Sequence, residues 1–180
     1  EFESVATITE DGRDALYAIV NRTVNGNTVR YIERLEKREQ TVAEDCFYVD
    51  SGLSYNGVTA TITGATQADP VVITATAHPF VNGDSVRIQD VVGMTELNDN
   101  VYIVANAATN TFELTTTDGT AFTAYTSGGT ALKVITTVSG ADHLELKDVI
   151  ILADGIVVED KTIASGSVTL DTPANKIHIG

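Results

Sequence analysis

The side chains that most often carry out chemistry in proteins are few in this sequence. The three histidines, His78, His143 and His178, lie far apart, and none has a neighbour at the spacing of a zinc site or of a Ser–His–Asp triad. We expect each of them to be a turn or packing residue. The single cysteine, Cys46, excludes an internal disulfide and a cysteine zinc cluster. It lies in EDCFYVD with no basic neighbour to stabilise a thiolate, so we expect a buried structural thiol.

Catalytic and metal-binding motifs are absent from the sequence as well. No Gly-x-Ser-x-Gly, phosphate-binding loop or dinucleotide fingerprint occurs. ELNDNVY is a poor match to a calcium loop, because Asp99 stands alone between two asparagines. A polysaccharide hydrolase that uses two of the many carboxylates stays open, since sequence alone does not pair them across a substrate. We therefore predict no catalytic, cofactor-binding or metal-binding residue, no cofactor, and a protein that is not an enzyme.

The chain is strongly acidic. It has 180 residues, with 25 acidic and 11 basic side chains and a net charge of −14. This charge repels nucleic acid and anionic membrane surfaces, so we expect no specific nucleic-acid binding. No apolar run approaches the roughly 20 residues that span a bilayer, so we expect no membrane insertion. The charge favours solubility, and in a channel it would also let DNA pass without adhering.

A β-hairpin is predicted for residues 16–36, LYAIVNRTVNGNTVRYIERLE. Asn25-Gly26 supplies the positive φ angles of a type I′ turn. A hairpin centred there has one largely apolar face and pairs Val24 with Asn27, Val20 with Tyr31, and Leu16 with Leu35. YIERLEKREQ alone also fits a helical period, but the turn and the preceding strand favour the hairpin. Further on, Thr41 and Glu44 have capping-box spacing, which predicts one short helical turn.

The composition between residues 58 and 133 shifts to Thr, Ala, Val and Ile. Short strand candidates separated by turn residues follow in order: ATITGA, VVITATA, DSVRIQDV, VYIVANA, TFELTTT and TALKVITTV. This spacing predicts a small barrel or sandwich, with Tyr102, Phe112, Phe122 and Tyr125 in or near its core. In the tail, the apolar VIILADG predicts a central strand, followed by turns at Asp154-Gly155 and Ser165-Gly166.

These patterns predict an all-β chain in which one domain is inserted into another. The outer β domain would comprise residues 1–57 and 134–180, and a small β-barrel or sandwich would occupy residues 58–133. The chain should enter and leave the inserted segment at neighbouring points, near Gly57 and Val134.

The middle segment resembles a known family. TATAHPFVNGDSVRIQDVVGMTELNDNVYIVANAATNTFELTTTDGTAFTAYTSGG combines an H-x-F-x-x-G-D-x-V opening, a G-M-x-E-L-N loop, Y-x-V and F-x-L strands and a late Y-x-x-G-G. Residues 72–132 are thus similar to the first catalytic cysteine half-domain (FCCH) of ubiquitin-activating enzymes. The segment has no cysteine, so the resemblance implies a fold and no activity. We expect GMTELNDN to be a strand connection in which Gly93 permits a tight backbone, Met94 and Leu97 plug the barrel end, and residues 98–100 turn the chain.

The flanking segments carry a second resemblance. VNGNTVRYIERLEKR, EDCFYVDSGLSYNG and TVSGADHLELKDVIILADGIVVEDKTIASGSVTL resemble consecutive pieces of a bacteriophage tail protein of the tubular or nozzle kind. In such relatives DSGLSYNG leads directly to TVSGADHLE, and the FCCH-like module occurs as an insertion. The resemblance implies a non-catalytic structural component of a phage or prophage tail. Such a protein is made in the bacterial host cytoplasm, is located in the virion, and contacts other tail subunits in a homo-oligomeric ring. The alternative is a binding module that displays loops to a host-surface ligand such as a glycan.

Overall fold

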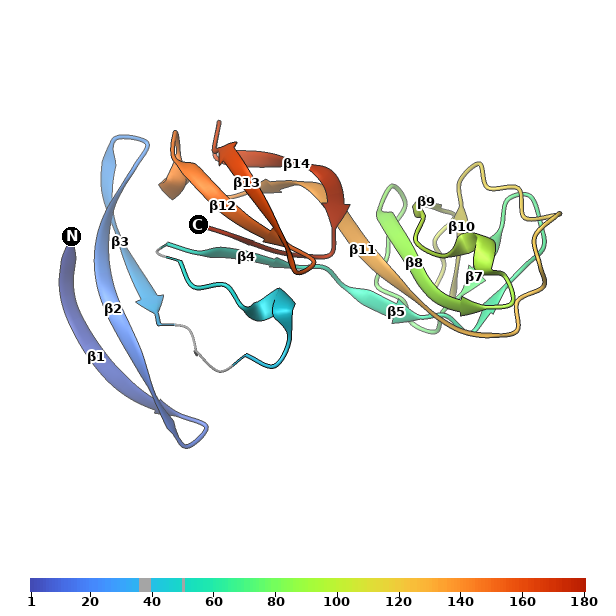
Figure 1. Ribbon diagram of the computed structural model, residues 1–180, viewed down its shortest axis with the longest axis horizontal. Helices are drawn as coiled ribbons and strands as arrows, with labels where there is room; N and C mark the ends of the chain where they lie inside the picture. Colours follow the sequence, from blue (N-terminus) through green and yellow to red (C-terminus); the bar gives the residue numbers. More distant parts are fainter. Residues whose placement is uncertain (36–39, 50) are drawn as a thin grey trace. The chain divides into compact units, whose positions relative to one another are not determined.

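The computed structural model describes residues 1–35, 40–49 and 51–180, and its backbone in these ranges is almost entirely strands and turns (Figure 1). The prediction of an all-β chain is confirmed. The helical segments in these ranges are three-residue 3-10 turns: η1 Ala43–Asp45, η2 Thr95–Leu97 and η3 Asp142–Leu144. None of the helical segments in the described ranges is long and apolar enough to span a membrane.

The described chain divides into two compact units. Unit 1 comprises residues 1–55, 136–172 and 176–180, and unit 2 comprises residues 56–135 and 173–175. The short piece at 173–175 was not foreseen from the sequence, and independent folding of the two parts stays a prediction. The chain enters and leaves the middle segment at adjacent points, as expected, because the Lys133 N–H donates to the Val58 carbonyl at 2.9 Å.

Unit 2 is a small closed barrel. Its strands are β5 Thr59–Thr61, β6 Gly64–Ala65, β7 Val72–Thr74, β8 Ser85–Val92, β9 Val101–Ala105, β10 Thr111–Leu114 and the first part of β11 Ser127–Ser139. The sheet order is β11-β8-β9-β10-β7-β6, and β5 pairs with the other side of β11. Only Ile62 and Thr63 separate β5 from β6, and their N–H groups donate to Gly129 and Thr74. This bent segment therefore joins the two ends of the sheet, which removes its open edges.

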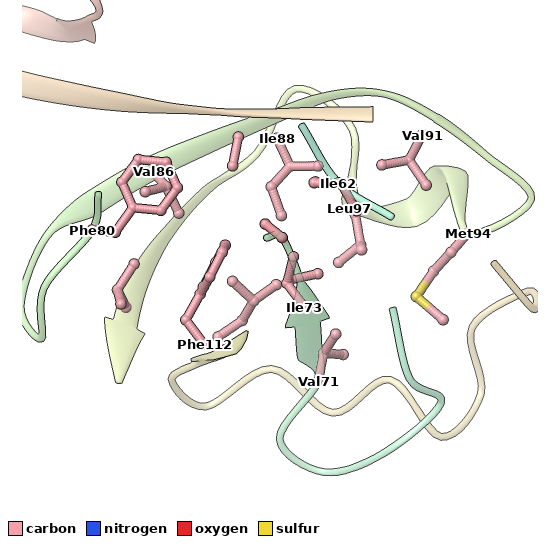
Figure 2. Close-up of a cluster of buried hydrophobic side chains, with 14 residues drawn as sticks. Ile62, Val71, Ile73, Phe80, Val86, Ile88, Val91, Met94, Leu97 and Phe112 are labelled. Atoms are coloured by element: carbon pink, nitrogen blue, oxygen red, sulfur yellow. The ribbon is translucent and has the colours of Figure 1, made fainter. Parts of the chain in front are cut away.

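The barrel interior is filled by inward-facing residues of its strands and by side chains of the connecting segments, such as Phe80 and Met94 (Figure 2). In β8 the side chains of Val86 and Ile88 are fully buried, whereas the polar neighbours Arg87 and Gln89 are not. This period of two is what a strand with one core face requires. The predicted core position of the four aromatic residues is confirmed, since Phe112 is fully buried and the others pack against the core cluster: Tyr102, Phe122 and Tyr125.

Unit 1 contains a four-stranded sheet with the order β13-β12-β15-β4. These strands are β4 Leu53–Asn56, β12 Asp148–Ala153, β13 Ile156–Thr162 and β15 Lys176–Ile179. The apolar run VIILA forms most of β12, which lies between β13 and β15, so the prediction of a central strand is confirmed. Strand β14, Ser167–Ala174, pairs with β11.

A separate three-stranded antiparallel sheet in unit 1 contains β1 Phe2–Glu10, β2 Arg13–Val24 and β3 Asn27–Arg34. The predicted hairpin is confirmed, because Val24 pairs with Asn27 and Val20 with Tyr31. The turn residues Asn25 and Gly26 have φ angles of 50° and 77°, as a type I′ turn requires.

Two local features differ from the expectations. Strand β1 was not predicted, although ATIT alternates apolar and polar residues and Asp11-Gly12 has the positive φ angles of a tight turn. The helical turn η1 occurs, but Val42 occupies its N-cap and no side chain caps it, so the proposed role of Thr41 is wrong. Part of the alternative helical segment, residues 36–39, lies outside the described residues, while its start at Tyr31 belongs to β3.

Candidate functional site

The loop at residues 93–100 is a structured strand connection, as predicted. Gly93 has a φ angle of 92°, and a Cβ atom there would lie 2.2 Å from the Ala124 carbonyl oxygen. Met94 and Leu97 are fully buried in the hydrophobic core of the barrel (Figure 2). Asp99 turns the chain with a φ angle of 63°. Backbone geometry and core packing therefore account for these positions.

Polar side chains of this loop are occupied by internal hydrogen bonds. The Asn98 amide accepts from the Val91 N–H at 2.9 Å and donates to the Val91 carbonyl at 3.0 Å, as a neighbouring strand would. The Glu96 carboxylate accepts from the backbone N–H and the hydroxyl of Thr123. These donors, with the backbone N–H bond of Thr123 as the largest contribution, lower the pKa of Glu96. The polar side chains of Asn98 and Glu96 therefore stabilise the loop and the segments next to it.

His78 is a packing residue, as predicted. Its ring is stacked on Phe80 with a centroid distance of 5.6 Å and meets Phe112 edge-on at 5.0 Å. The Nε2–H group donates to the Thr111 carbonyl at 3.0 Å. His143 similarly donates from Nε2 to the Ser51 carbonyl at 2.9 Å and lies 5.8 Å from the Tyr31 ring. Both histidines therefore stabilise local structure.

The arrangement of side chains that most resembles a catalytic site lies in unit 1, and it was not predicted from the sequence. Ser54 Oγ of β4 contacts His178 Nδ1 of β15 at 2.6 Å, and His178 Nε2 lies 3.9 Å from Asp45 Oδ1 of η1. If the serine donates, the other ring nitrogen carries the proton and faces the carboxylate. This is the order of a Ser–His–Asp relay with the two ring nitrogens exchanged. No short-range signal reveals it, because 124 residues separate Ser54 from His178.

The surroundings of this constellation indicate a structural role. Asp45 forms an ion pair with Lys176 Nζ at 2.7 Å, so its charge is shared with another cation. The 3.9 Å separation from His178 is too long for a hydrogen bond. Phe47 stacks on His178 at 5.6 Å, and the Ser54 side chain is exposed on a regular strand. We interpret the cluster as a polar contact that holds η1 and β4 against β15.

A cavity in unit 1 lies elsewhere, beside strands β1 to β3. It has a volume of about 170 Å³, and its lining residues are Glu10, Arg13, Asp14, Ala15, Leu16, Arg34 and Leu35. A nucleophilic serine needs a bound acyl group beside it. The described cavity therefore does not supply a substrate site for Ser54.

The prediction for Cys46 is wrong, because this cysteine is exposed. It follows the last residue of η1, and its Sγ atom lies 3.5 Å from the Val42 carbonyl oxygen. The turn directs the thiol to the surface, whereas the aromatic neighbour Phe47 packs inward on His178. Among the described residues, no three histidine, cysteine or acidic side chains are grouped so that they could hold a metal ion.

The fold of unit 2 agrees with a comparison of the sequence with known families. Residues 69–135 match the family model of the ubiquitin-activating enzyme E1 FCCH domain. A search of curated proteins gave no match. The matched range contains the resemblance predicted for residues 72–132, and the FCCH domain is a non-catalytic part of those enzymes. This chain therefore contains an FCCH-like β domain within its unit 2 barrel.

Proposed function

We propose that this chain belongs to a non-catalytic structural component of a phage or prophage tail that acts through contacts with other subunits. The observation that carries the proposal is the three-stranded sheet of unit 1. It exposes large apolar side chains on both faces, including Val5 and Ile32, at 64% and 76% exposure. Contiguous exposed apolar surface of this kind is typical of protein–protein contact sites.

The sequence resemblance supplies the setting. The segments on either side of the FCCH-like domain are similar to pieces of a tubular or nozzle-type tail protein, and these segments contribute most of unit 1. The protein would be made in the bacterial host cytoplasm and incorporated into the virion beside other tail subunits. The net charge of −14 suits such a place, because an acidic wall does not retain passing DNA.

The test is to locate the chain in particles. An antiserum raised against the 180-residue chain should decorate the tails of particles released by the bacterium that encodes it, as seen by immunogold electron microscopy. Mass spectrometry of the purified particles should detect peptides of both units. Particles that lack these peptides would refute the proposal.

The alternative is display of a binding module to the host surface. A glycan array probed with the 180-residue chain distinguishes the two functions. Specific binding to a defined glycan would favour display, whereas absence of binding together with tail decoration supports a structural role.

A further inference from the structure

The three-stranded sheet of unit 1 exposes apolar side chains on both faces. Val5 pairs with Ala18, whereas Ile32 pairs with Ile19. Consecutive residues of β2 point to opposite faces, so Val5 and Ile32 lie on opposite sides of the sheet. The face on the side of Val5, called the Val5 face below, carries six exposed large apolar residues: Phe2, Val5, Leu16, Val29, Tyr31 and Leu35. Within it Val20 is buried and Tyr31 contacts His143, whereas Phe2, Val5 and Leu35 are each more than 60% exposed.

Both outer strands of this sheet have an unpaired side in the described part of the chain. The pairing defines which backbone groups face outward. The Leu35 N–H donates to the Leu16 carbonyl, so Leu16 directs its backbone groups toward β3. Its partner on the other side, Thr7, therefore directs its own N–H and carbonyl away from β2. Residues of β2 alternate, so Ile19 points toward β1, and its partner Ile32 directs its backbone groups away from β2.

These two edges have few of the devices that prevent strand addition. Strand β1 is nine residues long and β3 is eight, and neither contains proline or lysine. A bulge between Phe2 and Ser4 interrupts only the first part of β1. Long unprotected edges are templates for pairing with another chain.

The charged side chains of β1 and β3 indicate which edges of two copies would pair. Strand β1 contains the acids Glu3 and Glu10 and no basic residue. Strand β3 contains Arg30 and Arg34 and a single acid, Glu33, which forms an ion pair with Arg22 of β2. Within one sheet these side chains already attract across β2: Arg30 lies 2.9 Å from Glu3, and Arg34 lies 3.1 Å from Glu10. A β1 edge beside a second β1 edge would bring acids together, whereas β3 beside β1 brings opposite charges together.

We propose that β3 of one copy of this chain pairs with β1 of the next copy, so that their three-stranded sheets form one continuous sheet. The inference rests on the proposed function, because it names the surface through which identical tail subunits meet. Strands β1 and β3 run in the same direction, since both are antiparallel to β2. The contact is head to tail, and a head-to-tail contact closes into a ring when the rotation between copies allows it. The Val5 faces of neighbouring copies then lie on the same side of the joined sheet, each with the Arg22–Glu33 ion pair among its apolar residues.

Two proline variants test this arrangement. Thr7→Pro removes an outward N–H from the β1 edge, and Ile32→Pro removes one from the β3 edge. Neither change removes a hydrogen bond of the sheet itself, and proline is tolerated on strand edges. Ala6→Pro is the contrasting variant, because Ala6 pairs with Tyr17 and directs its N–H toward β2. Far-UV circular dichroism should be unchanged for the first two variants and altered for Ala6→Pro.

The measurement is molar mass by sedimentation equilibrium over a range of protein concentrations. The parent chain should rise above the 19.1 kDa of a single chain with increasing concentration. Each edge variant alone should stay at 19.1 kDa, because one of its two edges is blocked. An equimolar mixture of the two variants should form a 1:1 dimer, since each supplies the edge that the other lacks.

Other outcomes overturn the proposal in distinct ways. Association of one edge variant alone would indicate a symmetric contact between identical edges. Association of both variants at the parent level would indicate assembly through another surface, with the tail function left standing. A parent chain that stays monomeric at all concentrations would refute the edge pairing. The particle experiment decides the tail function separately, since it does not depend on which surface mediates assembly.

Discussion

Replacing Gly93 with alanine should destabilise the barrel of unit 2 far more than the same change at Gly83. Both glycines have nearly the same positive φ angle, 92° and 90°. Their surroundings differ completely. A Cβ atom at Gly83 meets nothing within 4 Å, whereas at Gly93 it would lie 2.2 Å from the Ala124 carbonyl oxygen and 2.7 Å from the Thr126 nitrogen. The pair therefore separates backbone strain from steric contact.

The expected magnitudes follow from these two contributions. A left-handed conformation costs a residue other than glycine about 1–2 kcal/mol. Alanine gives the unfolded chain less conformational entropy than glycine does, so less entropy is lost on folding. This difference offsets about 0.4–1 kcal/mol of the cost. Gly83→Ala should thus lower the free energy of unfolding by about 1 kcal/mol. Gly93→Ala adds an overlap with backbone atoms, and forced overpacking costs a further ~1–3 kcal/mol.

The chain provides its own reporter for this measurement. Met94 is the single methionine and is fully buried in the unit 2 core, so selective labelling of methionine methyl groups gives one NMR signal for that barrel. Urea titrations followed by this signal give the free energy of unfolding of the barrel for the parent and both variants. Equal losses of stability at the two glycines would refute the close approach of the Ala124 backbone to Gly93.

The remaining predictions concern both units. Gly26→Val should lower the melting temperature of unit 1, because a β-branched residue resists the φ angle of 77° in the hairpin turn; an unchanged temperature would contradict that turn. Glu96 has a lowered pKa in the folded state, so its stabilising effect is present above its ordinary value near 4.5 and is lost as the pH falls through the lowered value. Glu96→Gln should therefore make the stability of the barrel less dependent on pH in this acidic range, as urea titrations at several pH values will show. Deleting residues 59–135 should leave a folded remainder by circular dichroism, whereas an aggregated product would count against the insertion. A fluorophosphonate probe should not label Ser54, and labelling abolished by Ser54→Ala would establish the nucleophile that we exclude.

Short-range patterns were enough to predict the elements whose cause is local. The Asn25-Gly26 turn defines the pairing of Val20 with Tyr31, because turn geometry determines the register of a hairpin. The alternation in DSVRIQDV predicts both a strand and its core face, and Val86 and Ile88 are buried accordingly. Motif order along residues 72–132 likewise predicted the FCCH-like domain that the family comparison supports.

Solvent exposure was predicted poorly where it depends on what lies opposite a residue. The apolar side of the hairpin was expected to be half-buried, yet Leu35 is 61% exposed, because the described residues leave most of the Val5 face open. Cys46 was expected in the core and is exposed, since the direction of one turn decides its position. The sequence shows that a side chain is apolar. Whether that side chain is buried depends on the surface that other parts of the chain or another subunit place against it.

Contacts between distant residues were decided by the tertiary structure alone. The barrel closes because β5 and β6 bridge β11 and β7, although each is only two or three residues long and weakly patterned. Ser54 contacts His178, and Glu96 contacts Thr123, at sequence separations of 124 and 27. The physical reason is that local preferences define strands and turns, whereas such pairs form only when sheet closure brings their strands together.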